Sequence, residues 1–195
     1  MSTLLLASAS PRRAQLLTAA GIRFEARPAE VDEAPRPGEV PADYVRRVAR
    51  EKAEAVARLN PGRLVLGADT TVVVDGTILA KAGDPDEARA MLARLAGRAH
   101  QVLTGVALVG PGISAVDVAA TTVEFAPMTS EDIDQYVATD EWRDKAGAYA
   151  VQGRAGRFVT RLEGSYTNVV GLPVSLVYHL LMRYPEGRGA VRSQP

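Results

Sequence analysis

The sequence predicts an α/β fold: a single elongated domain in which a mixed, twisted sheet is flanked by helices. Apolar runs of strand length alternate with helix-like segments along the chain, which is typical of this class. Several consecutive runs are joined by tight turns, which make neighbouring strands antiparallel, so the sheet should be mixed. The 195 residues contain no repeat, linker or low-complexity tract. We therefore expect one domain over 1–195, with a flexible tail after about residue 184.

The N-terminal part predicts one strand, two helices and a loop. Leu4–Leu6 has the pattern of a short buried strand. The first helix has Ser10 as its N-cap, Pro11 at its first position and a glycine beyond its end. Prolines make residues 25–38 a loop, and a long helix follows over 41–59, where an Asn-Pro-Gly sequence ends it.

The central part predicts paired strands around one helix. The stretch "RLVLGADTTVVVDGTIL" predicts two strands around an interruption, with Asp75–Gly76 as the two-residue turn of a hairpin. Asp84 caps a helix that closes at Gly97. Strands over 101–109 and 113–125 are joined by a Gly-Pro-Gly turn.

The C-terminal part predicts two further helices. Thr129 caps a helix that runs through Ala138. Residues 144–166 mix glycines with short strand-like pieces, and the last helix is expected over 172–182.

Composition and charge exclude several classes of function. The 23 acidic and 23 basic residues balance, so no global field attracts nucleic acid or an anionic membrane. There is no cysteine, which excludes disulfides, thiolate zinc sites and a cysteine nucleophile. No apolar run approaches the roughly 20 residues that span a bilayer. We expect a soluble, cytoplasmic protein without a nucleic-acid or membrane partner.

Two charged residues stand where the pattern expects apolar ones. Lys52 lies on the apolar stripe of the long helix. Its ammonium is therefore expected either to be buried, where it pairs with an acid or binds an anion, or to reach water while the alkyl stem packs on the stripe. Asp69 interrupts an apolar run, where a carboxylate needs a cation, a metal or several donors. The alternative for Asp69 is a turn residue that bonds its own loop. Its small neighbours would let a ligand approach the backbone.

The loop before the long helix carries two adjacent acids, Asp32 and Glu33, in the sequence "EVDE". Hard divalent cations take oxygen ligands, and Mg²⁺ uses one or two carboxylates plus substrate phosphates. These acids could therefore complete a metal site with Asp69, although an acidic pair in a proline-rich loop is usually just solvated.

The turn between the first strand and the first helix has the composition of an anion site. Helix N-termini present unpaired N–H groups and the positive end of the dipole. Ser8 and Ser10 flank the turn, and Arg12 and Arg13 lie in a first helical turn that favours acids. Arginines there are repelled by the positive end of the helix dipole, and a bound polyanion such as a triphosphate would turn this repulsion into a net attraction. The alternative is that both arginines point to solvent. No Walker A sequence occurs.

Seven segments, in the order given, resemble the Maf family of nucleotide pyrophosphatases, first linked to septum formation. They are "LASASPRR", "EVDE", "AREKA", "LGADT", "LAGRAHQVLTGVAL", "DKAGAYAVQG" and "VVGLPVSL", within about residues 3–182. The resemblance implies a Maf/ITPase-like fold and a house-cleaning enzyme of the cytoplasm. It also implies hydrolysis of a nucleoside triphosphate to monophosphate and pyrophosphate with Mg²⁺ or Mn²⁺, and a homodimer at the level of the family.

The resemblance also implies roles for individual residues. The family's general base falls on Asp69, which acts as base or as metal ligand. An acid of the "EVDE" loop, Asp32 or Glu33, joins it at the metal. The other phosphate- and metal-handling positions fall on Ser8, Arg13, Lys52 and Lys81.

Three positions, Arg12, Thr70 and Gln152, sort the family's branches. This chain has the Arg, Thr and Gln of the branch that acts on dTTP and UTP, where the 7-methyl-GTP branch has Trp, Gln and Glu. The Gln152 amide offers a donor and an acceptor to a base edge. The chain departs from the family pattern in having Ala-Lys-Ala around Lys81, and Trp142 after its glutamate.

Other functions stay open at this level. A 7-methyl-GTP or inosine-type pyrophosphatase would share the chemistry, in which water attacks the α-phosphorus and pyrophosphate leaves. A nucleotide-binding regulator of septum formation would share the binding site without catalysis.

Overall fold

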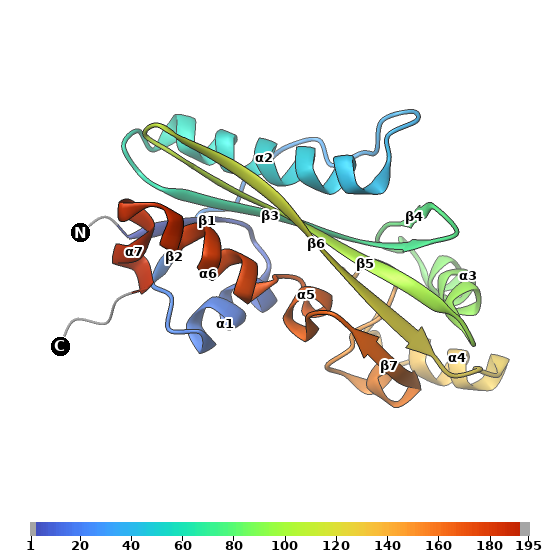
Figure 1. Cartoon of the computed structure of the whole chain (residues 1–195). Helices are drawn as coiled ribbons and strands as arrows, with labels where there is room; N and C mark the ends of the chain where they lie inside the picture. The colour runs from blue at the N-terminus through green and yellow to red at the C-terminus, as the bar shows by residue number, and fades with distance from the viewer. Residues whose placement is uncertain (1–2, 192–195) are drawn as a thin grey trace.

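The computed structural model describes residues 3–191 and contains one seven-stranded mixed sheet in the order β2-β1-β3-β5-β6-β7, with β4 paired to β3 (Figure 1). The strands are β1 (Leu4–Ala7), β2 (Phe24–Ala26), β3 (Val65–Val74), β4 (Thr77–Leu79), β5 (Ala99–Gly110), β6 (Ile113–Phe125) and β7 (Val159–Glu163). The helices are α1 (Pro11–Ala19), α2 (Pro41–Leu59), α3 (Pro85–Leu95), α4 (Ser130–Val137), α5 (Tyr166–Val170), α6 (Val174–Arg183) and α7 (Pro185–Val191). The strand β1 runs parallel to β2 and β3, and all other pairs are antiparallel. The pairs β3–β4 and β5–β6 are the hairpins that the turns predict.

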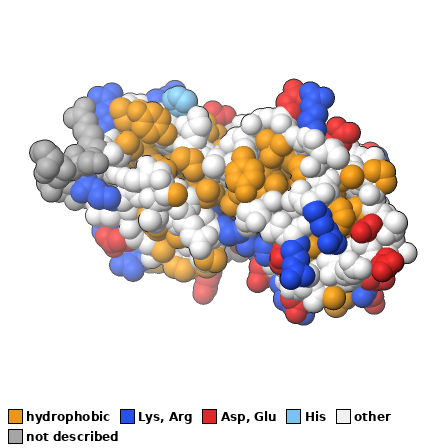
Figure 2. Space-filling model, turned by 90° about the horizontal axis from the view of Figure 1, so that it is seen from below, with side chains coloured by type: hydrophobic (Ala, Val, Ile, Leu, Met, Phe, Trp, Pro, Cys, Tyr) orange, Lys and Arg blue, Asp and Glu red, His pale blue; other side chains and the backbone are white. Residues whose placement is uncertain are grey.

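The long strands β3, β5 and β6 run through the whole molecule and join two halves (Figure 1). One half is a core formed with α1, α6 and α7, and the other is a core formed with α3, α4 and the segment around Trp142. The helix α2 covers the opposite face of the sheet, over two smaller apolar clusters. In the space-filling view a waist separates the two lobes, and basic side chains gather at it (Figure 2).

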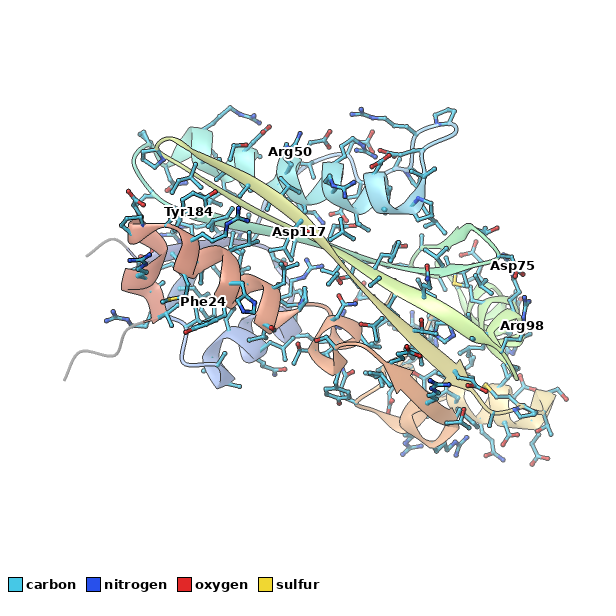
Figure 3. All side chains as sticks on the ribbon, viewed as in Figure 1. Phe24, Arg50, Asp75, Arg98, Asp117 and Tyr184 are labelled. Atoms are coloured by element: carbon cyan, nitrogen blue, oxygen red, sulfur yellow. The ribbon has the colours of Figure 1, made fainter. Side chains whose placement is uncertain are left out.

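The expected interruption of the central strand is wrong. The strand β3 continues without a break from Val65 to Val74, and Asp69 lies opposite Gly105 in the antiparallel register with β5. The hairpin turn is confirmed: Asp75 and Gly76 both have positive φ, and Arg98 donates to the Asp75 carboxylate at 2.6 Å at the end of the sheet (Figure 3). Asp69 is therefore a strand residue, and the turn alternative does not apply to it.

Glycines on and opposite the strand that carries Asp69 allow a helix to pack closely on the sheet. A Cβ at Gly67 would collide with the backbone of Ala49, and one at Gly105 with the carbonyl of Val45. Both glycines lie under α2, which needs this close approach to cover the sheet. The same approach brings the α2 residue Lys52 against Asp69.

We predict that Gly105→Ala destabilises the protein by about 1–3 kcal/mol, because the helix backbone above it must move. Urea unfolding measures the change. The matched control is Gly189→Ala, since Gly189 has open space around its Cβ position. An unchanged free energy of unfolding in Gly105→Ala would show that the close packing of α2 is not needed.

The three predicted helix caps lie where the sequence places them, and two of them form the expected capping bonds. Thr129 and Asp132 form a complete capping box at α4. Asp84 accepts from the backbone of Glu87, whose own side chain bonds the backbone of Gly83. Ser10 occupies the N-cap of α1, but its hydroxyl makes no capping bond.

Residues 185–191, which belong to the tail expected to be flexible, form the helix α7. Gly187 packs so closely on Leu181 that a Cβ would collide with its backbone, and the carbonyl of Ala190 accepts from the backbone of Arg23 at 3.0 Å. These tertiary contacts override the glycine-rich local sequence. Residues 192–195, which the same expectation covers, lie outside the described part of the chain. Within 3–191 no helix is long and apolar enough to cross a membrane.

Candidate active site

A cavity of about 820 Å³ lies at the junction of the two halves. One edge of β3 pairs with β1 as far as Gly67 and with β4 from Val72, so residues 68–71 have no strand partner on that edge within the described chain. The cavity opens at this gap, beyond the carboxyl end of β1, where α/β sheets commonly bind ligands. Side chains from both faces of β3 therefore reach it, Asp69 on the α2 face and Thr70 on the other.

A buried ion cluster forms the α2 side of the cavity. The Lys52 ammonium lies 2.8 Å from Asp69 Oδ1 and 3.0 Å from Glu33 Oε2. Lys52 and Asp69 are only 6% and 5% exposed. The alternative in which the lysine head reaches water is therefore wrong, because the buried ammonium pairs with two carboxylates, the buried one of Asp69 and the partly exposed one of Glu33.

The second carboxylate oxygen of Asp69 has no partner. Asp69 Oδ2 is buried and makes no hydrogen bond among residues 3–191. An unpartnered buried carboxylate oxygen is costly, so its position favours a ligand that the site is built to receive. Together with the Glu33 carboxylate it gives two hard oxygen donors, which fit Mg²⁺ or Mn²⁺ when phosphate oxygens complete the shell. The described residues contain no group of three or more acids or histidines that could hold a metal alone.

The two acids of the "EVDE" loop differ in placement. Glu33 lines the cavity and pairs with Lys52. Asp32 is exposed, and its carboxylate accepts from the backbone of Ala34 at 2.9 Å, which fixes the local turn. Only Glu33 is brought together with Asp69.

Arg13 points into the protein, which excludes the solvent alternative for it. Its Nε donates to the carbonyl of Gly171 at 2.9 Å, Nη1 to Ser8 Oγ at 3.1 Å and Nη2 to Thr70 Oγ1 at 3.2 Å. Arg12 instead crosses the mouth of the cavity and donates to the carbonyl of Asp144 at 3.1 Å. The backbone N–H of Ser10 donates to Ser8 Oγ at 3.2 Å.

The Thr70 hydroxyl is fully used inside the protein. It accepts from Arg13, donates to the carbonyl of Gly171 at 3.2 Å and lies 2.9 Å from the hydroxyl of Thr104. Three partners satisfy a hydroxyl, which has one donor and two acceptor sites. Sequence reasoning missed Thr104, whose only signal is a threonine within an apolar strand. Thr70 and Thr104 together brace the guanidinium of Arg13.

The electrostatics of the cavity favour an anion. Burial lowers the pKa of Arg13, an effect that Asp69 and Glu33 partly oppose. Burial also lowers the pKa of Arg12. The pKa of Lys145 is lowered by burial and by the charge of Arg12. After burial, the charge of Arg12 also contributes to lowering the pKa of Arg13 and of Lys145, and a polyanion bound beside these cations would offset that repulsion.

The far rim is built from the segment 139–153, which contains Gln152. Gln152 is exposed and lines the cavity. Lys81, whose backbone forms an isolated β-bridge with Ala146, lines it as well. Trp142, one of the two places where the chain departs from the family pattern, is buried. Its indole N–H donates to the carbonyl of Val137, and the Arg143 guanidinium lies 4.6 Å above its ring. Sequence reasoning also missed these further lining residues: Tyr44, Arg143, Tyr149 and Gly171.

Comparison with known proteins agrees with this geometry. A family model described as "Maf-like protein" matches residues 3–184. A Koribacter versatilis protein named dTTP/UTP pyrophosphatase is 47% identical over 92% of this chain and 93% of its own length. Proteins of the same name from Symbiobacterium thermophilum and Anaeromyxobacter dehalogenans are 50% and 52% identical, over 94% and 92% of this chain and 95% and 93% of their own.

Two solved structures share the fold at low sequence identity. The Staphylococcus aureus Ham1 protein has a TM-score of 0.55 and 17% identity, covering 93% of this chain and 98% of that one. A HAM1 protein from Coxiella burnetii has a TM-score of 0.51 and 13% identity, covering 94% of this chain and 100% of that one. These likenesses establish the α/β architecture alone.

Proposed function

The chain belongs to the Maf-like protein family, and from that membership we propose that it hydrolyses dTTP and UTP to the nucleoside monophosphate and pyrophosphate. The observation that carries the proposal is the buried Lys52–Asp69 pair: Asp69 lines a cavity that cations also line, and one oxygen of its carboxylate is buried without a hydrogen-bond partner among residues 3–191. A binding protein has no need of a costly unpartnered carboxylate beside phosphates, and this favours catalysis over regulation by binding alone.

In the proposed reaction, a water oxygen bonds to the α-phosphorus, the bond from that phosphorus to the bridging oxygen breaks, and pyrophosphate leaves. Asp69 Oδ2 is the atom through which this residue acts, either taking the proton of the water or binding a metal. Lys52 holds the other oxygen, Oδ1, and so fixes the direction of the carboxylate.

We assign the cofactor as Mg²⁺ or Mn²⁺, held by Asp69 and Glu33 together with substrate oxygens. When bound, such an ion neutralises phosphate charge and polarises the α-phosphoryl group. The third acid, Asp32, would act on the metal only through the turn that it stabilises.

The triphosphate would be bound by the basic and hydroxyl groups of the cavity. Positioned cations stabilise the charge that develops on a transferring phosphoryl group. The residues proposed for this task are Ser8, Ser10, Arg12, Arg13, Lys52 and Lys81.

Base selection is proposed for Arg12, Thr70 and Gln152, by two different routes. Gln152 and Arg12 lie at the rim, where an amide and a guanidinium can meet a base edge. The saturated hydroxyl of Thr70 would act indirectly, by fixing Arg13. The names of the relatives support dTTP and UTP as the substrates.

The proposed substrates also suggest a cellular setting. The pools of dTTP and UTP are in the cytoplasm, so the reaction would take place there. A homodimer is the assembly that the family resemblance favours.

A substrate panel tests the proposal. With Mg²⁺ or Mn²⁺ present, release of pyrophosphate is expected to be faster from dTTP and UTP than from CTP, ITP and 7-methyl-GTP. Fastest turnover of 7-methyl-GTP or ITP would contradict the pyrimidine assignment. Tight binding of dTTP without any pyrophosphate release would contradict the enzymatic one.

A further inference from the structure

Glu33 lines the site but belongs to no helix or strand. It lies in the irregular segment before α2, and its side chain is 43% exposed, yet its carboxylate is 3.0 Å from the buried Lys52 ammonium. Such an arrangement needs contacts that hold the backbone of the segment in place. We call residues 32–39 the strap.

Two side chains of α2 bind consecutive carbonyl groups of the strap. The Tyr44 hydroxyl donates to the carbonyl of Glu33 at 3.0 Å, and Arg47 Nη2 donates to the carbonyl of Ala34 at 3.1 Å. Tyr44 lines the cavity two helical turns before Lys52, on the same helix. One helix thus carries both the lysine and the donors that bring the acid to it.

Arg47 also fixes the far end of the strap. Its Nε and Nη2 bind the two oxygens of the Glu39 carboxylate at 2.6 and 2.8 Å, and Nη1 binds Glu51 at 3.1 Å. The side chains of Arg47 and Glu39 are only 14% and 11% exposed. The bond to Arg47 lowers the pKa of Glu39 to about 2, so the pair stays charged over the physiological range. Bidentate pairs of this kind are the geometrically specific ones.

We propose that Tyr44 and Arg47 are positioning residues that hold Glu33 at the Lys52–Asp69 pair through the backbone of the strap. The inference rests on the proposed function, in which Glu33 is an acid that handles the metal and the phosphates. The inference adds Tyr44 and Arg47, which lie outside every motif assigned to the hydrolysis, as the residues that determine the position of Glu33.

A structural role for Tyr44 is the competing explanation, since its ring packs with Val45, Val48, Val73 and Leu103. Tyr44→Phe keeps the ring and removes only the hydroxyl, and Arg47→Met keeps most of the apolar stem. Matched controls are Tyr178→Phe, at an exposed tyrosine, and Arg46→Met, whose guanidinium pairs only with its neighbour Asp43 among the described residues.

Hydrogen–deuterium exchange of the amides in 32–39 tests the positioning without reference to catalysis. Exchange is expected to be about tenfold faster or more in Tyr44→Phe and Arg47→Met, and unchanged in both controls. Parent-like exchange in both strap variants would overturn the inference, whether or not the protein hydrolyses dTTP.

A double-mutant cycle tests whether the effect passes through Glu33. Tyr44→Phe is expected to lower kcat/KM for dTTP by about tenfold in the parent protein, as outer-shell partners do, and to have no further effect in Glu33→Gln. Equal losses in both backgrounds would overturn the inference and leave Tyr44 with a structural role. Absence of dTTP turnover in the parent would instead contradict the proposed function, and the exchange experiment would then decide the inference by itself.

Discussion

Asp69→Asn is expected to lower kcat/KM for dTTP by about 10³-fold, within the range for loss of a general base. The amide keeps the shape of the side chain and can still accept from Lys52. It removes the negative charge and the basicity of the buried, unpartnered Oδ2, which both proposed roles of Asp69 require. Steady-state release of pyrophosphate at saturating Mg²⁺ measures the loss.

The structure provides the controls for this variant. Lys52 keeps a charged partner in Glu33, so the variant should fold, and thermal unfolding checks that it does. Asp117→Asn, at an exposed site on β6, should retain the parent rate (Figure 3). A folded Asp69→Asn protein that hydrolyses dTTP at the parent rate would remove Asp69 from the mechanism.

Arg13→Lys is expected to lower kcat/KM by about 10²-fold although the charge is retained. Arg13 uses three nitrogens on three acceptors, and a single ammonium cannot satisfy all of them. The acceptors on Ser8, Thr70 and Gly171 would compete for one group, and each lost charge-assisted bond costs roughly 1.5–3 kcal/mol. Kinetics with dTTP and UTP measure the effect.

Arg161→Lys is the control for this change, because Arg161 is exposed on β7 and pairs only with Glu163 among residues 3–191. A parent-like KM and kcat in Arg13→Lys would mean that the site needs only a positive charge at this position. The proposed role of Thr70, which braces the fork of Arg13, would then fall as well.

Much of the fold follows from local signals in the sequence. The bounds of α2, the Asp75–Gly76 hairpin and the helix cap at Thr129 all depend on residues close together in the chain. The misplaced charges of Lys52 and Asp69 also indicated the site, because a charge on an apolar face needs a partner. Such signals require no knowledge of the tertiary structure.

The errors arise where distant segments decide the local structure. The continuity of β3 through Asp69 depends on nine paired positions in β5 and on α2 packing over Gly67. The helix α7 lies in a glycine-containing segment, and the carbonyl of its residue Ala190 accepts a hydrogen bond from the distant backbone N–H of Arg23. Neither contact can be inferred from the residues near it in sequence.

At the site, too, local sequence indicates some features, whereas others depend on contacts between distant residues. Glu33 and Asp32 are adjacent and chemically alike, and only the strap contacts of Tyr44 and Arg47 distinguish their positions. Thr104 reads as an ordinary strand residue until its register with Thr70 is known. A pattern of residues can therefore identify the chemistry of a site before it can identify the residues that position it.

Hydrolysis of dTTP in ¹⁸O-labelled water tests the central claim most directly. The account predicts dTMP that carries one ¹⁸O atom and unlabelled pyrophosphate, because water attacks the α-phosphorus. Formation of dTDP and inorganic phosphate, or of labelled pyrophosphate with unlabelled dTMP, would contradict it.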